Sequence, residues 1–139
     1  MSIEIGKLIN LTKITDPRGN LTVAESCRNI PFCIQRAYWV YDIPGGESRG
    51  GHAHRQCKEF LIAVGGSFHV TLDNGKEQCT YLLNHPYQGL LVDTGIWRTL
   101  NDFSSGAVCL VLASDLYNEE DYIREYDEFL KYIKNKADV

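Results

Sequence analysis

The sequence of 139 residues lacks several features that mark specialised classes of protein. No apolar run approaches the roughly 20 residues needed to cross a bilayer. The first ten residues lack the basic segment, apolar stretch and cleavage site of a signal peptide. We therefore expect a cytoplasmic protein that does not associate with a membrane. Linkers, low-complexity tracts and internal repeats are also missing, which predicts one domain over residues 1–139.

Paired cysteines and an excess of positive charge are missing as well. The five cysteines form no CxxC pair, and an odd number without such spacing is typical of reduced thiols in a cytosolic protein. A net charge of −4 argues against a broad surface for nucleic acid. A small anionic ligand remains compatible with this charge, because a few of the seven arginines could converge on one pocket.

What the sequence does contain is a series of short segments rich in β-branched and aromatic residues, separated by turn signals. This spacing predicts an all-β sandwich or barrel over about residues 3–115. The clearest hairpin covers residues 67–81 and turns at Asn74-Gly75, a pair that supplies positive φ angles. Its residues predicted to face the core are Phe68, Val70 and Leu72.

Near the end of the chain the apolar period becomes helical, which predicts one α-helix over about residues 118–135. The predicted apolar stripe consists of Ile123, Tyr126, Leu130 and Ile133. Asn118 is a suitable cap for this helix. Three acidic residues suit its positive N-terminal end: Glu119, Glu120 and Asp121. We expect the helix to pack on the outside of the barrel, with Arg124 in its second turn and within reach of a ligand.

The most informative residues are His52 and His54, two positions apart on a predicted strand. Side chains at i and i+2 share one face of a strand, with Cα atoms about 6.5–7 Å apart. Such a pair can hold one metal ion or act on two neighbouring atoms of one substrate. Polar side chains that point into a barrel need a functional or structural reason. We therefore predict that this pair carries the chemistry.

The surrounding spacing resembles the first motif of the cupin superfamily. That motif, Gly-x5-His-x-His-x(3–4)-Glu-x6-Gly, is met by Gly46, His52, His54, Glu59 and Gly66. The resemblance implies a cupin fold, a double-stranded β-helix or jelly-roll barrel.

The second cupin motif should lie within residues 89–101, where Trp97 and Arg98 stand in place of the usual histidine. A metal set of three histidines and a carboxylate is therefore missing from the expected positions. A smaller set of His52, His54 and Glu59 remains an alternative.

A narrower resemblance covers about residues 8–132 and keeps its order and spacing. The segments that carry it are Ile30-Pro-Phe-Cys-Ile-Gln-Arg-Ala-Tyr38, Arg49-Gly-Gly-His-Ala-His54, Asp102-Phe-Ser-Ser105, Leu112-Ala-Ser-Asp115 and Asp121-Tyr-Ile-Arg124. They are similar to the nucleotide-sugar 3,4-ketoisomerases. These enzymes convert dTDP-4-keto-6-deoxy-glucose to a dTDP-3-keto-6-deoxy-hexose through an enediol, in the synthesis of deoxyaminosugars for lipopolysaccharide or other glycans. The resemblance implies an isomerase without metal or cofactor that works as a homodimer.

The resemblance also implies roles for the two histidines. His52 would remove the C3 proton, and His54 would move a proton between the two sugar oxygens, tasks that suit a group with a pKa near neutrality. Tyr38 is supported independently, because it shares a strand face with Arg36 and could donate a hydrogen bond to developing oxyanion charge.

The pyrophosphate needs cations with fixed donor geometry, which arginine offers. Arg49 is the best candidate, followed by Arg18 and Arg124. Arg18 lies in a loop that the family places near the active site, and it favours the galacto product.

Two further residues complete the predicted substrate site, and both depart from the family pattern. Arg98 stands where members carry histidine, and Glu59 stands where some carry glutamine. Three other functions remain open on the sequence: a metal-dependent cupin, a nucleotide-sugar epimerase and a binding module without catalysis.

Overall fold

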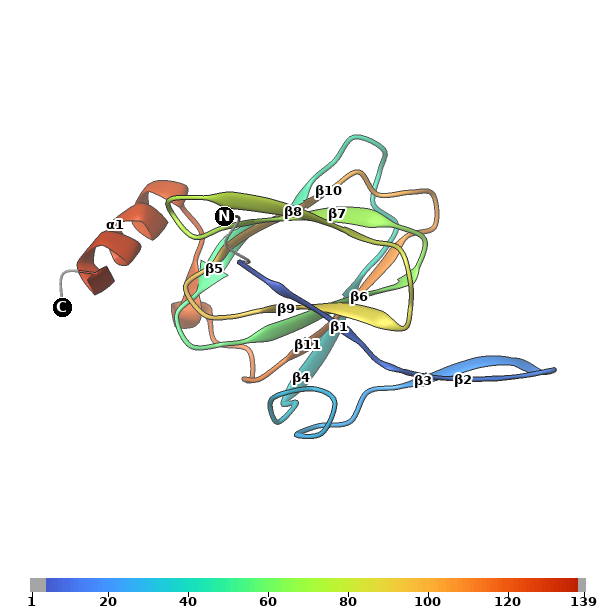
Figure 1. The fold of residues 1–139 in the computed structure, drawn as a ribbon. Helices are drawn as coiled ribbons and strands as arrows, with labels where there is room; N and C mark the ends of the chain where they lie inside the picture. Colours follow the sequence, from blue (N-terminus) through green and yellow to red (C-terminus); the bar gives the residue numbers. More distant parts are fainter. Residues whose placement is uncertain (1–4, 138–139) are drawn as a thin grey trace.

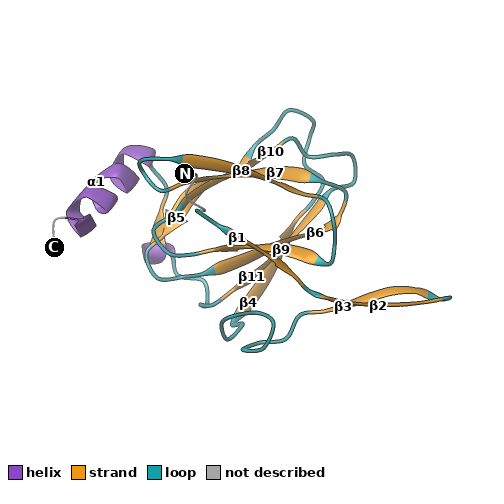
Figure 2. Cartoon of the chain, viewed as in Figure 1, coloured by secondary structure: helices purple, strands orange, loops and turns teal. Residues whose placement is uncertain are grey.

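A computed structural model describes residues 5–137 and shows two five-stranded sheets that face each other (Figures 1 and 2). In spatial order, the first sheet contains β1 (Lys7–Asn10), β9 (Gln88–Val92), β6 (Glu59–Gly65), β11 (Val108–Ala113) and β4 (Arg36–Val40). The second contains β12 (Tyr122–Ile123), β5 (Arg49–His54), β10 (Trp97–Asn101), β7 (Phe68–Asp73) and β8 (Gln78–Leu83). The predicted cupin barrel is confirmed; residues 3 and 4 of its expected range lie outside the described residues.

The core fills the space between the two sheets, and the predicted hairpin supplies part of it. Phe68, Val70 and Leu72 are all fully buried, as expected. The turn differs from the prediction, because Asn74 N–H donates to the Glu77 carbonyl (3.2 Å) and closes a longer loop. The Asn74 side chain stabilises this loop by accepting the backbone N–H groups of residues 76 and 77.

The prediction of one helix over residues 118–135 is wrong in its first half. Asn118 caps a short 3₁₀ helix, η1 (Glu119–Asp121), and the chain then forms β12. This strand pairs with β5, with Tyr122 opposite His54 and Ile123 opposite Ala53. Sheet pairing therefore overrides the local helical period, and Arg124 follows a strand instead of occupying a helix.

The true helix, α1, covers Tyr126–Ala137 and lies at one side of the barrel (Figure 1). Its buried anchor is Phe129, which packs with Ala53 and Ile123. Leu130, predicted to face the barrel, is more than one-third exposed. The helix starts eight residues later than predicted, so Ile123 of the predicted stripe lies in β12 instead. No helix within residues 5–137 is long and apolar enough to cross a membrane.

A two-stranded hairpin, β2 (Thr12–Asp16) and β3 (Gly19–Val23), projects away from the barrel on the side opposite α1 (Figure 1). Two of its large apolar side chains, Ile14 and Leu21, are more than half exposed. Arg18 lies in its turn. The hairpin therefore carries apolar surface that its own barrel leaves uncovered.

Candidate active site

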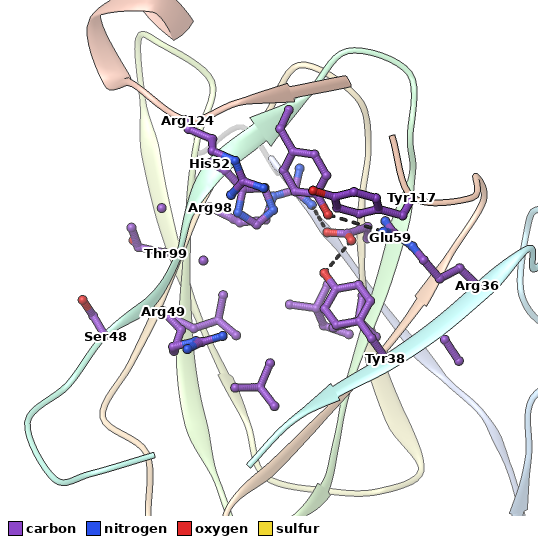
Figure 3. A pocket seen from close by; sticks show the side chains of 18 residues that line it. Arg36, Tyr38, Ser48, Arg49, His52, Glu59, Arg98, Thr99, Tyr117 and Arg124 are labelled. Carbon is purple, nitrogen blue, oxygen red and sulfur yellow. Dashed lines mark hydrogen bonds and ion pairs between the residues drawn. The ribbon is translucent and has the colours of Figure 1, made fainter. Parts of the chain in front are cut away.

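A cavity of about 760 Å³ opens between the two sheets and contains most of the predicted site (Figure 3). Seven of the nine predicted side chains line it: Arg36, Tyr38, Arg49, His52, Glu59, Arg98 and Arg124. Apolar residues line another part of the cavity: Val40, Leu61, Leu100 and Val111. The cavity thus combines an apolar wall with converging basic and acidic groups, as small-molecule sites do.

A bulge in β5 brings Arg49 and His52 to the same cavity. Three positions along a regular strand would place their side chains on opposite faces. In the pairing with β10, His52 lies opposite Arg98 and Arg49 lies opposite Leu100, so β5 contains one extra residue. Gly50 absorbs this insertion with a φ of +83°, a conformation that glycine adopts readily.

Glu59 is the centre of a buried hydrogen-bonded group in the cavity wall. Its Oε2 accepts the Tyr38 hydroxyl at 2.6 Å, and its Oε1 accepts Arg98 Nη1 at 2.6 Å. Burial opposes ionisation of this carboxyl, but His54, Arg98 and Tyr38 together outweigh it and hold its pKa well below the usual range. Burial and the Glu59 carboxylate raise the pKa of Tyr38, which therefore stays a hydrogen-bond donor.

His52 faces the cavity as a neutral imidazole. Burial and the positive charge of Arg98 lower its pKa to about 3. Its Nε2 is buried and has no hydrogen-bond partner among the described residues. When the imidazole carries its single N–H on Nδ1, this unpartnered Nε2 can accept a proton from a molecule bound in the cavity.

His54 lies behind His52 and does not line the cavity. Its side chain is fully buried, and its ring meets the His52 ring edge-on, with centroids 4.9 Å apart. Its Nδ1 lies 2.8 Å from Asp121 Oδ2, and its Nε2 lies 3.6 Å from Glu59 Oε1. The structure therefore connects His54 to the cavity through Glu59 and Tyr38.

Three site residues were missed by the sequence reasoning: Tyr117, Asp121 and Tyr122. Tyr117 and Tyr122 line the cavity, and the Tyr122 ring lies 4.4 Å from that of His54. The segment from Asp121 to Arg124 carries part of the family resemblance, which is the available signal. The helical period instead predicts that Asp121 is a charge at a helix N-terminus.

The arginines occupy different parts of the site. Arg49 lies at one end of the cavity in Figure 3, and its side chain makes no hydrogen bond or ion pair within residues 5–137. Arg124 packs over the Tyr122 ring at 4.2 Å and forms a bidentate ion pair with Glu119. Arg36 Nη1 donates to the Tyr122 hydroxyl at 3.5 Å.

Arg18 is not brought to the cavity of its own chain. Its side chain is 90% exposed and pairs with Asp16 in the hairpin turn. The expectation that this loop lies beside the site is therefore not met within one chain, because the hairpin extends away from the barrel.

The donor set does not suit a divalent metal ion. Ligand atoms of His52, His54 and Glu59 lie within 4.8 Å of one another, as a metal site would require. The Arg98 guanidinium, however, already occupies Glu59 Oε1 and places a fixed positive charge beside any incoming cation. Repulsion by this charge opposes metal binding by His52, His54 and Glu59.

Comparison with known proteins decides the family. The family model FdtA, described as WxcM-like, C-terminal, matches residues 5–134. The chain belongs to this family. A TDP-4-oxo-6-deoxy-alpha-D-glucose-3,4-oxoisomerase of Aneurinibacillus thermoaerophilus is 47% identical to this FdtA-family chain over 127 residues, 91% of each protein. The resemblance to the 3,4-ketoisomerases drawn from the sequence is confirmed.

Solved structures agree with this assignment. A 3,4-ketoisomerase from Helicobacter canadensis superposes with a TM-score of 0.91 at 42% identity, covering 93% of this chain and 97% of its own. The ketoisomerase QdtA from Thermoanaerobacterium thermosaccharolyticum, in complex with TDP, gives a TM-score of 0.93 at 36% identity. The match covers 97% of this chain and 98% of the QdtA chain. An epimerase from Mycobacterium tuberculosis gives a TM-score of 0.73 at 16% identity, covers 88% of this chain and 69% of its own, and shares the fold alone.

Proposed function

We propose that this FdtA-family chain moves the ketone of a TDP-linked 4-keto-6-deoxyhexose from C4 to C3. The observation that carries the proposal is the neutral His52 imidazole beside the Tyr38–Glu59–Arg98 group, in a cavity of suitable size. The relative that is 47% identical over 91% of its length is named for this isomerisation of TDP-4-oxo-6-deoxy-α-D-glucose.

In the proposed reaction, His52 first removes the C3 proton, which the adjacent C4 carbonyl makes acidic. The electron pair forms the C3–C4 double bond of an enediol while O4 receives a proton. Loss of the proton on O3 then restores a carbonyl at C3, and the protonated His52 returns its proton to C4. Protons balance over the cycle, and no oxidant or reductant is needed.

We assign the movement of the oxygen-bound proton to His54. Its connection to the cavity runs through two residues: Tyr38 faces the cavity and donates to Glu59 Oε2, and Glu59 Oε1 lies 3.6 Å from His54 Nε2. Glu59 and Asp121 flank the imidazole and stabilise it when it gains a proton. The fixed Arg98 guanidinium in the cavity wall also offers positive charge to the developing oxyanion.

The basic residues around the cavity suit the pyrophosphate. Arg49 has its guanidinium uncommitted at one end, and Arg36 and Arg124 lie near Tyr117 and Tyr122. Guanidinium groups give the planar, charge-assisted hydrogen bonds that phosphate oxygens accept. We propose Arg49 as the main pyrophosphate ligand.

We also propose that the chain works as a cytoplasmic homodimer in glycan or lipopolysaccharide synthesis. Exposed Ile14 and Leu21 on the β2–β3 hairpin supply apolar surface for a second copy. The same contact would deliver Arg18 to the partner's cavity and favour the galacto product. Light scattering tests this: the wild type should have twice the mass of one chain, and I14D/L21D should be monomeric.

The deciding experiment is incubation with TDP-4-keto-6-deoxyglucose in heavy water, followed by NMR of the sugar. The ketone should move to C3, deuterium should enter the ring, and the C4 signal should give the product's configuration. Exchange at the ring without movement of the ketone would indicate an epimerase. Binding without any exchange would indicate a sugar-nucleotide sensor.

A further inference from the structure

The Asp121 carboxylate contacts three nitrogen atoms behind the site. Its Oδ2 lies 2.8 Å from His54 Nδ1 and also accepts Cys57 N–H at 3.3 Å, and its Oδ1 accepts Gln56 N–H at 2.6 Å. The residue comes from η1, which follows the barrel strands, and its side chain is buried. Asp121 therefore reaches the catalytic strand from a separate part of the chain.

This contact determines where His54 exchanges protons. An ionised carboxylate can only accept a hydrogen bond, so the neutral imidazole carries its proton on Nδ1. The lone pair is then on Nε2, which faces Glu59 and has no hydrogen-bond partner among the described residues. Every gain or loss of a proton by His54 must take place at Nε2, the nitrogen directed toward Glu59.

We propose that Asp121 is a positioning residue of the isomerase: it fixes the His54 tautomer and so enables His54 to carry the proton between the sugar oxygens. The inference rests on the proposed function, because it gives His54 its place in that reaction. Asp121 does not line the cavity, and it acts through His54 alone. A carboxylate that orients a catalytic imidazole has this effect in other enzymes.

The substitution Asp121→Asn separates positioning from packing. The Gln56 N–H is a donor, so it selects the amide oxygen of the asparagine and turns the NH₂ group toward His54. The NH₂ group donates to Nδ1, which moves the imidazole proton to Nε2. Shape and most contacts are kept, but the lone pair needed for proton transfer now faces away from Glu59.

Two measurements read this change. In ¹⁵N-histidine NMR of the protein without substrate, wild-type His54 should carry a proton on Nδ1, and the D121N protein should carry it on Nε2. With substrate, D121N should lose about 10²- to 10⁴-fold in kcat with little change in KM, the range seen when an imidazole is held in the wrong tautomer. Deuterium exchange at C3 should persist, because His52 is intact.

The chain provides a matched control in a second histidine–aspartate pair. His69 Nδ1 and Asp102 Oδ2 lie 2.9 Å apart on the exposed surface, outside the cavity. Asp102→Asn should leave kcat unchanged. Equal losses in the D102N and D121N proteins would indicate a general effect on stability and would overturn the proposal.

A measurement on the wild type alone also tests the role of Asp121. A wild-type spectrum in which His54 Nδ1 lacks a proton would refute it, whether or not the D121N protein folds. Conversion by a folded D121N protein at more than about a third of the wild-type rate would refute it as well. Failure of the wild type to move the ketone would instead refute the proposed function and leave the tautomer measurement valid.

Discussion

The buried ion pair between Arg98 and Glu59 makes a strong prediction about stability. Both side chains are 1% exposed, and their charged atoms lie 2.6 Å apart. The substitution Arg98→Met keeps the volume and the apolar stem but removes the charge. It leaves Glu59 buried with Tyr38 and His54 as its remaining polar neighbours.

The size of the loss follows from these contacts. Removing one partner of a buried ion pair costs about 3–5 kcal/mol, since it strands the other charge. Arg98 Nη2 also donates to the Ile96 carbonyl at 2.9 Å, a contact worth about 1 kcal/mol. We therefore expect a decrease of about 4–6 kcal/mol in unfolding free energy at pH 7, or roughly 10–25 °C in Tm for a chain of this size.

The pH dependence of the unfolding free energy shows whether the unpaired Glu59 carboxylate causes the loss. In the wild type the pKa of Glu59 is depressed, so its stabilising contribution is present above the ordinary pKa of about 4.5 and declines as pH falls. In R98M the pKa of Glu59 is higher than in the wild type, so less stability is lost on acidification. The difference in unfolding free energy between the wild type and R98M should shrink as the pH falls through and below about 4.5.

Urea unfolding monitored by fluorescence measures these free energies. The double variant Glu59→Gln/Arg98→Met should recover at least half of the loss, because no charge remains buried. The surface control is Arg28→Met, which removes an exposed pair at 3.5 Å and should cost less than about 1 kcal/mol. A loss in R98M as small as this control, or no recovery in the double variant, would refute the reasoning.

The remaining predictions concern the cavity. His52→Asn should lose both C3 exchange and conversion, by at least about 10²-fold, because no other described group is placed to replace the base. NMR in heavy water measures both, and retained turnover would remove His52 from this role. Arg49→Ala should weaken TDP binding by about 1.5–3 kcal/mol in calorimetry, with partial recovery in Arg49→Lys; unchanged affinity in both would place Arg49 outside the site. The pKa of His52, lowered to about 3, predicts that its protonation will not reduce kcat/KM between about pH 8 and 5. A decline centred near 6.5, the ordinary histidine value, that persists in the His54→Asn protein would contradict the burial argument.

The sequence was most informative where function depends on spacing within one strand. His52, His54 and Glu59 could be singled out by the spacing of the cupin motif, and Tyr38 with Arg36 by strand alternation. The second inference needs only the period of two along a strand. The hairpin strands were predicted for the same reason, since Phe68, Val70 and Leu72 alternate with polar residues.

Features that depend on distant pairing could not be predicted in this way. The segment from Asn118 to Arg124 has a helical period, but two of its residues pair with β5, and a single sequence carries no signal for that partner. The bulge at Gly50 could not be predicted, because the sequence alone does not distinguish a glycine in a strand bulge from a glycine in a loop. The placement of Arg18 depends on the direction of a whole hairpin, which its own residues do not specify.

The short pairing of β12 with β5 also has a consequence for the order in which the protein matures. All other barrel strands are complete by Ala113, whereas Asp121 and Tyr122 follow them along the chain. Those strands pair with one another without β12, so the barrel can close around His52 before the later residues dock. Catalytic competence would then be acquired in a separate, final event: the docking of a few residues onto a barrel that has already folded.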